Sequence, residues 1–213
     1  MTSFALFAAL RWRKDLRFEL KAMVLIALML GMPAWGTEIP PATVVRFNTV
    51  CANCHEGECS GRLSFQSGVD AAKNHIRRYL GLGALSEREV GDLFALLKYT
   101  KEKCRQYPVK PEVPASGRWG ARELESWRNP VEGGYFIPLG ALKPGEHRLN
   151  LNFTGDLQGK VRVTDAHFEI AADEHLCRDR EPALVFTVSG GEYYLHLQTQ
   201  AKLLGLELDQ QRY

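Results

Sequence analysis

The stretch that decides the fold is Cys51-Ala52-Asn53-Cys54-His55. Its two cysteines are three positions apart, so on an α-helix their side chains lie on the same side. Val44 and Phe47 precede them at the same helical spacing, which predicts that this face of the helix turns toward a core. The stretch therefore predicts an amphipathic helix that presents two thiols and an imidazole to the interior of a small helical unit.

The pattern C-x-x-C-H is typical of covalent haem attachment. We expect Cys51 and Cys54 each to form a thioether with one vinyl group of a single haem c, and His55 to be the proximal iron ligand. Two other chemistries use similar residues, namely a zinc site that includes Cys59 and a redox-active dithiol. A structural zinc site normally draws its ligands from two separated clusters, and a thioredoxin-like pair needs a βαβ setting. The sequence offers neither arrangement, which favours haem.

The segment from Thr43 to Arg105 resembles a small class I cytochrome c domain. Phe47 stands four residues before Cys51, where that family usually has an aromatic residue on its first helix. Ser86-Glu87-Arg88-Glu89 is a capping box that opens a second helix with one apolar face. The resemblance covers about a third of the chain and implies a small all-α domain with one haem that carries electrons.

The resemblance leaves the sixth iron ligand open. All four methionines (Met1, Met23, Met29 and Met32) lie in the N-terminal segment, so the methionine that the family usually employs is missing. His75 is the other histidine of the cytochrome-like segment and lies in a predicted helix over 69–80, which makes it the candidate for the distal ligand. An open or water-occupied position and a ligand from elsewhere are the alternatives, and this choice determines redox potential and ligand access.

Three cysteines remain after haem attachment, namely Cys59, Cys104 and Cys177. Two of them are expected to pair in an oxidising compartment. We predict a Cys59–Cys104 disulfide, which would tie together the ends of a domain too small to be stable through its core alone. Cys177 is then the thiol left over. A bond from one of the other two to Cys177, or three reduced cysteines, are the alternatives.

The first 36 residues have the order of a secretory signal. A basic segment, Arg11–Lys21, precedes the apolar run Val24–Leu30, and the small residues Ala34 and Gly36 stand at the outer positions of a cleavage site. We predict a signal peptide over residues 1–36 and a mature protein that is periplasmic or otherwise exported. An uncleaved anchor is the alternative and would be the chain's link to a membrane, but the apolar stretch is shorter than the ~20 residues that a spanning helix needs.

Beyond the signal, the sequence predicts two domains joined by a linker. A haem domain is expected over 37–106, a proline-rich linker over 107–120 and a second domain over 121–213. The segment from Tyr107 to Gly117 contains three prolines and a small polar end, which suits a stiff, extended connection.

The hydrophobic pattern changes from helical to alternating after the linker. Leu149, Leu151 and Phe153 alternate with asparagines, and Val161 and Val163 flank Arg162. Further strands are expected at Tyr135–Leu139, Ala166–Ile170, Ala183–Ser189, Tyr193–Gln200 and Leu203–Leu208. Several short strands separated by glycine turns predict an antiparallel β-sandwich. The predicted fold class is α+β, a small all-α cytochrome c-like domain followed by a β-sandwich of unidentified family.

Composition limits the partners of the mature chain. The 213 residues are 45% hydrophobic and 24% charged, typical of a globular protein. The net charge of +2 depends on the five basic residues among the first 36, so no basic patch indicates a nucleic-acid partner. A redox partner protein is the expected partner.

The predicted function is periplasmic electron transfer by a mono-haem c-type cytochrome whose β domain serves docking or binding. Whether the protein is an enzyme stays open, and an electron carrier is favoured over a catalyst. One alternative is a haem-based sensor or peroxidase-like protein with an open sixth position. Another is a carbohydrate- or protein-binding module with an accessory haem, in which strand aromatics form a sugar-stacking platform. The aromatic residues considered are Trp119, Trp127, Tyr135, Phe136, Tyr193 and Tyr194.

Overall fold

The computed structural model describes residues 38–55, 68–81, 85–109, 113–155, 157–177 and 182–210. Residues 39–213 form one compact unit, and residues 1–38 form another, of which only Glu38 is described. The predicted signal peptide over 1–36 therefore lies outside the described residues. Among the helices of the described ranges, none is long and apolar enough to cross a membrane.

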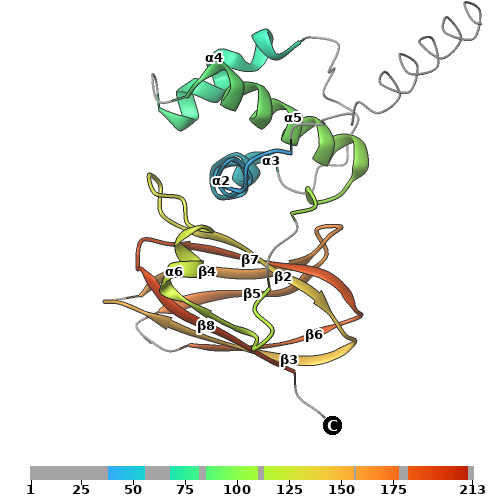
Figure 1. Ribbon diagram of the computed structural model, residues 1–213, viewed down its shortest axis with the longest axis vertical. Helices are drawn as coiled ribbons and strands as arrows, with labels where there is room; N and C mark the ends of the chain where they lie inside the picture. Colours follow the sequence, from blue (N-terminus) through green and yellow to red (C-terminus); the bar gives the residue numbers. More distant parts are fainter. Residues whose placement is uncertain are drawn as a thin grey trace, which may run out of the picture. The chain divides into compact units, whose positions relative to one another are not determined.

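The helical part begins with three short helices that follow one another without a break. These are α2 (Pro41–Arg46), the π-helical turn η1 (Phe47–Cys51) and α3 (Ala52–His55). Pro41 opens the first of them, where a missing N–H costs nothing and the fixed φ favours the helix. Two longer helices, α4 (Val69–Leu80) and α5 (Glu87–Lys103), complete this part (Figure 1).

The predicted capping box at the start of α5 is confirmed. The Ser86 hydroxyl accepts a hydrogen bond from the Glu89 backbone N–H at 3.3 Å, and the Glu89 carboxylate accepts one from the Ser86 N–H at 2.9 Å. Lys73 and Arg77 of α4 both pair with Glu87, in the first turn of α5. Their hydrogen bonds and charges lower the pKa of Glu87. The start of α5 is thus fixed both by its cap and by its neighbour.

Substitution of Ser86 by alanine is expected to lower the free energy of unfolding by about 1 kcal/mol, because the Glu89 N–H loses its acceptor at the helix end. Urea denaturation followed by circular dichroism measures the change. Ser189→Ala is the control, since its hydroxyl makes no hydrogen bond within the described residues. An unchanged midpoint for Ser86→Ala would show that the cap does not contribute to stability.

The second half of the chain forms two antiparallel four-stranded sheets packed face to face (Figure 1). One sheet has the order β1-β8-β3-β6 and the other the order β2-β7-β4-β5. The strands are β1 (Arg118–Gly120), β2 (Tyr135–Leu142), β3 (Gly145–Phe153), β4 (Gln158–Asp165), β5 (Ile170–Cys177), β6 (Ala183–Val188), β7 (Gly191–Thr199) and β8 (Leu203–Gln210), with the short helix α6 (Ala121–Glu125) after β1. The protein is thus α+β with an antiparallel sandwich, as the alternating pattern predicts.

One predicted strand is wrong. Residues 166–169 turn between β4 and β5, and Phe168 has φ 67°, in the left-handed region that a regular strand does not adopt. The strand instead runs from Ile170 to Cys177 and includes the charged residues Asp173 and Glu174. β5 is an edge strand of its sheet, so only some of its side chains face the core, and charged residues are tolerated there.

Two hydrophobic cores stabilise the compact unit. The first lies between the sheets and includes Leu149, Leu151 and Val163. The second joins the helices to the outer face of the β2-β7-β4-β5 sheet, because Phe136 and Tyr194 pack in one cluster with Val44 and other helical residues. The Phe136 and Tyr194 rings are stacked, with centroids 5.3 Å apart and planes at 7°. The helices therefore pack on one sheet of the sandwich as a third layer.

Gln106 connects the helical part of the chain to the β-sandwich. It is buried, its backbone N–H donates to the Ala166 carbonyl at 2.8 Å, and its side-chain amide donates to the Thr164 hydroxyl at 3.4 Å. Tyr107 and Val109, in the predicted linker, pack against the second core. Residues 110–112 of that segment lie outside the described ranges.

The aromatic residues considered for a sugar-stacking platform are core residues. Tyr135 and Phe136 are 1% and 0% exposed, and Trp119, Tyr193 and Tyr194 are also buried. Trp127 is partly buried and packs against both cores. A platform built from these rings is therefore ruled out, because their faces are covered by other side chains.

Candidate functional site

The two cysteines of the C-x-x-C-H stretch lie on the η1–α3 segment. Both are free thiols, Cys51 half-buried and Cys54 exposed. The π-helical turn ends at Cys51, and the Ala52 N–H donates to the Phe47 carbonyl five residues earlier. Single π turns recur at functional sites because the extra residue shifts the side chains that follow relative to those before. Here the shift falls between Phe47, which faces the core, and the two thiols.

A pocket of about 180 Å³ brings both thiols and both candidate iron ligands together. Its lining is almost wholly apolar apart from these groups. The lining residues are Phe47, Val50, Cys51, Cys54, His55, Ala72, His75, Ile76, Tyr79, Leu93, Phe94 and Leu97. They come from η1, α3, α4 and α5, so four elements of the helical part contribute to one site.

The imidazoles of His55 and His75 both line this pocket and lie close together, in an edge-type arrangement. Their ring centroids are 6.1 Å apart and their planes make an angle of 65°. A histidine nitrogen binds a metal ion at about 2 Å, so two imidazoles on opposite sides of one ion have centroids about 6 Å apart once the ring radii are added. The two rings therefore have the spacing of two axial ligands of a single metal ion.

The mouth of the pocket lies at the protein surface. His75 is exposed, and the Tyr79 ring beside it, at a centroid distance of 4.8 Å, is 58% exposed. A porphyrin is larger than 180 Å³, so this pocket would hold only part of a haem, and His55 and His75 are the residues that would bind its iron. The apolar walls, the paired imidazoles and the two thiols together fit a covalently attached haem.

Burial raises the pKa of the Cys51 thiol from 9.0 to about 11, and the neighbouring Cys54 adds to the effect. The charge of Arg46 acts in the opposite direction but is outweighed. At neutral pH Cys51 is therefore a protonated thiol, which is a poor nucleophile.

In the haem-free chain, iodoacetamide is expected to alkylate Cys51 more slowly than Cys54 at pH 8. With a pKa of about 11, only about one Cys51 thiol in a thousand is ionised at that pH, and its side chain is half-buried. Peptide mass spectrometry at successive times measures both rates in one sample. Equal rates would contradict the burial of Cys51.

The raised pKa of Cys51 also predicts a pH dependence of stability for the haem-free chain. Below pH 9 the Cys51 thiol is protonated in the folded and the unfolded state, and its contribution to the free energy of unfolding is fully present. Between pH 9 and about 11 the unfolded chain releases the proton while the folded chain keeps it, so stability falls as pH rises. Cys51→Ala removes this dependence in a urea titration at several pH values.

The other cysteines differ in state. Cys104 is disulfide-bonded, whereas Cys177 is a free thiol on exposed β5. The predicted partner of Cys104, Cys59, lies outside the described residues, so the pairing stays a prediction. Within the described ranges, no group of three or more His, Cys, Asp and Glu side chains could hold a metal ion. Such a group supplies three or more protein ligands, whereas an iron held by a porphyrin needs only one or two.

The sandwich fixes the η1–α3 segment (Phe47–His55), the attachment helix of the predicted haem, through two side-chain hydrogen bonds. The Gln198 amide of β7 donates to Asn53 Oδ1 at 2.7 Å, and the Asn129 amide donates to the Thr49 hydroxyl at 2.8 Å. Asn53, one of the two residues between the cysteines, donates in turn to the Thr49 carbonyl at 3.1 Å. Sequence reasoning missed these contacts, because their partners lie 145 and 80 positions apart and no local pattern marks them.

Comparison with known proteins gives no family. No family model matches the chain, and no curated protein matches it. A GH115 4-O-methyl-α-glucuronidase with specificity for decorated arabinogalactans is 14% identical over 67% of this chain, with a TM-score of 0.31. The GH26-CBM35 β-(1,4)-mannanase of Podospora anserina is 8% identical over 38% of this chain, with a TM-score of 0.24. The capsular polysaccharide assembling protein CapF of Staphylococcus aureus is 11% identical over 85% of this chain, with a TM-score of 0.23.

The chain spans only part of each of these structures. It covers 25% of the glucuronidase, 20% of the mannanase and 61% of CapF. TM-scores this low do not establish a shared fold with any of the three proteins.

Proposed function

We propose that the protein is an exported mono-haem c-type cytochrome that transfers electrons. In this proposal Cys51 and Cys54 hold one haem c through thioethers, and His55 and His75 are the axial ligands of its iron. The observation that carries the proposal is that His55 and His75, with ring centroids 6.1 Å apart, line one apolar pocket together with both thiols. A bound haem c supplies a one-electron couple between ferrous and ferric iron.

The residues of the chain determine how that couple behaves. Leu93, Phe94 and Leu97 of α5 line the pocket and give it an apolar wall. Low local polarity and the identity of the axial ligands are two of the main determinants of a haem potential. Two imidazoles leave no open position for an exogenous ligand, which favours electron transfer over ligand sensing or peroxidase chemistry.

The surface position of the pocket suits exchange of electrons with another protein. Tyr79 and His75 border the mouth and are exposed, so a partner can approach the site without opening the fold. The partner that fits is a redox protein that docks at this mouth. The sandwich serves as a rigid support, because Gln198 and Asn129 hold the attachment helix from the opposite face.

Export is supported by two observations of different kinds. The order of a basic segment, an apolar run and small residues in 1–36 is that of a secretory signal. The disulfide at Cys104 is the type of bond that persists in an oxidising compartment. A periplasmic location agrees with both the secretory signal and the disulfide.

Absorption spectra test the proposal, on protein produced in a host that matures c-type cytochromes. Six-coordinate low-spin spectra are expected in the oxidised and the reduced form, and carbon monoxide should leave the reduced spectrum unchanged. A high-spin spectrum, or binding of carbon monoxide by the wild-type protein, would instead support the sensor or peroxidase-like function.

A further inference from the structure

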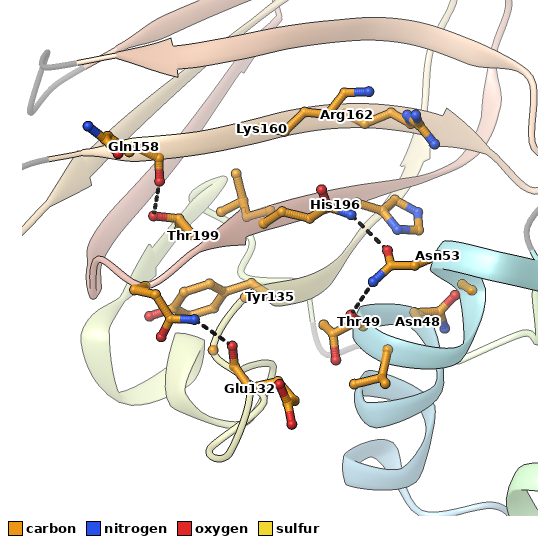
Figure 2. Close-up of a pocket in the computed structure, with 17 residues that line it drawn as sticks. Asn48, Thr49, Asn53, Glu132, Tyr135, Gln158, Lys160, Arg162, His196 and Thr199 are labelled. Carbon is orange, nitrogen blue, oxygen red and sulfur yellow. Dashed lines mark hydrogen bonds between the residues drawn. The ribbon is translucent and has the colours of Figure 1, made fainter. Parts of the chain in front are cut away.

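A second cavity lies on the other face of the attachment helix, between that helix and the outer face of β4 and β7 (Figure 2). Its volume of about 680 Å³ falls in the range of roughly 300–1,000 Å³ that small-molecule sites occupy. Val50 borders both this cavity and the histidine pocket, so the attachment helix separates the two sites. The proposed function does not use this cavity.

Side-chain amides and hydroxyls dominate its lining. The amides come from the helix on one side and from two strands on the other, and hydroxyls stand beside them. These residues are Asn48, Asn53, Gln158, Gln198 and Gln200, with Thr49 and Thr199. An amide offers both a donor and an acceptor, which is what a sugar hydroxyl needs from its partner.

Several of these groups are held in place by hydrogen bonds to their neighbours. Gln198 donates to Asn53, the Gln200 amide donates to the Glu132 carbonyl at 2.8 Å, and the Thr199 hydroxyl donates to the Gln158 carbonyl at 3.0 Å (Figure 2). In the part of the chain that the structure describes, the side-chain carbonyls of Gln198 and Gln200 accept no hydrogen bond. The amides of Gln198 and Gln200 are therefore oriented and retain hydrogen-bonding capacity for a ligand, while Gln158 is held at its backbone carbonyl.

Gly133 and Gly134 form part of the wall of the cavity. Both have positive φ, 71° and 77°, and a Cβ on Gly134 would stand 2.7 Å from the Leu197 carbonyl oxygen. The backbone thus approaches β7 more closely than a side chain would permit.

Two cations of β4 line the same cavity. Lys160 and Arg162 pair with Asp173 of β5, at 3.0 and 3.2 Å. Burial raises the pKa of Asp173, but the hydrogen bond from Lys160 and the charge of Arg162 outweigh it, so the net shift is downward. The carboxylate stays ionised and fixes both cations beside the amides.

We propose that this cavity binds a polyhydroxylated ligand of monosaccharide size, through the amides of Gln158, Gln198 and Gln200. An apolar ligand would leave these oriented amides unpaired, at a cost in free energy. The aromatic rings of the sandwich are buried, so affinity rests on hydrogen bonds instead of stacking. A neutral sugar and a sugar acid both carry the required hydroxyls. Lys160 distinguishes the two ligand classes, because only a sugar acid has a carboxylate for it to bind. The proposal is independent of the haem.

Calorimetric titration of the mature, haem-loaded protein tests this proposal. The probes are D-glucose, D-galactose and the two corresponding uronates, with propionate as a carboxylate that lacks hydroxyls. Gln158→Leu and Gln200→Leu remove one amide each at similar volume, and each is expected to weaken binding about fivefold. Asn152→Leu is the matched control, because Asn152 is exposed on β3 of the other sheet. Unchanged circular dichroism and Soret spectra show that each variant is folded.

Binding of at least one sugar, weakened by both glutamine variants and unchanged in the control, supports the site. Lys160→Met then distinguishes a neutral sugar from a sugar acid as the ligand. It should weaken the binding of a uronate and leave the binding of a neutral sugar unchanged. Absence of heat with all four sugars overturns the proposal, and so does sugar binding that both glutamine variants leave intact. Because calorimetry reports the sugar and the Soret band reports the haem, failure of this proposal and failure of the cytochrome proposal are distinguishable.

Discussion

Replacement of His75 by alanine is expected to convert the iron of the haem-loaded protein from low spin to high spin. The methyl group of alanine cannot replace an imidazole as an iron ligand, so in the proposed haem protein the sixth position would open while His55 and both thioethers would remain. Carbon monoxide should then bind the reduced variant and shift its Soret band. Absorption spectra with and without carbon monoxide measure both effects.

Two controls make the His75→Ala result specific. His175→Ala removes an exposed histidine of β5, in the sandwich, and should leave the spectra unchanged. Added imidazole should restore a low-spin spectrum to His75→Ala, since it replaces the missing ligand. A His75→Ala protein that stays low spin without imidazole would eliminate His75 as the ligand, although the haem attachment would stand.

Replacement of Phe136 by alanine is expected to lower the free energy of unfolding by about 3–5 kcal/mol. The Phe136 ring is fully buried where the helices meet the sheet, stacked on Tyr194 and edge-on to His196 at 4.9 Å. The substitution therefore leaves a cavity in the core shared by both parts. Urea unfolding followed in parallel by far-ultraviolet circular dichroism and by the Soret band measures the loss.

If the helices and the sandwich unfold as one unit, both signals should shift to the same lower midpoint in Phe136→Ala. Val185→Ala is the control, because Val185 is 45% exposed on β6 and its truncation should change stability by less than about 0.5 kcal/mol. A drop in the circular dichroism midpoint alone, with an unchanged Soret midpoint, would show that the haem-bearing helices are stable without the sandwich.

Much of the secondary structure could be predicted because its signals are local. The Ser86 capping box marks the start of α5, and the alternation around Leu149 and Val161 marks β3 and β4. The sequence does not predict β5, because an edge strand does not need the alternating apolar residues that identify a half-buried one.

The candidate site was predictable to the extent that its residues are close in sequence. Cys51, Cys54 and His55 form one motif, and His75 stood out as the other histidine of the helical segment. The contacts between the helices and the sandwich could not be predicted in this way. Phe136 and Tyr194 have the sequence signature of ordinary core residues, and only the folded chain shows that their core is the one beneath the helices.

The polar cavity was equally hidden from the sequence. Lys160, Arg162 and Gln198 occupy outward positions of alternating strands, which sequence reasoning assigns to a solvated face. They line a cavity only because the attachment helix lies above that face of the sheet. In the sequence, the aromatic residues suggest carbohydrate binding, but they are mostly core residues, whereas the amides that line the cavity have no recognisable sequence pattern.

Intact-mass spectrometry of the secreted protein, combined with its absorption spectrum, tests the central claim most directly. Production in a host with cytochrome c maturation machinery should give the mass of the processed chain plus one haem, together with a Soret band that survives denaturation, because thioethers do not dissociate. The Cys51→Ala, Cys54→Ala double variant should lose both features. A wild-type protein with the mass of the bare chain and no Soret band would contradict the account.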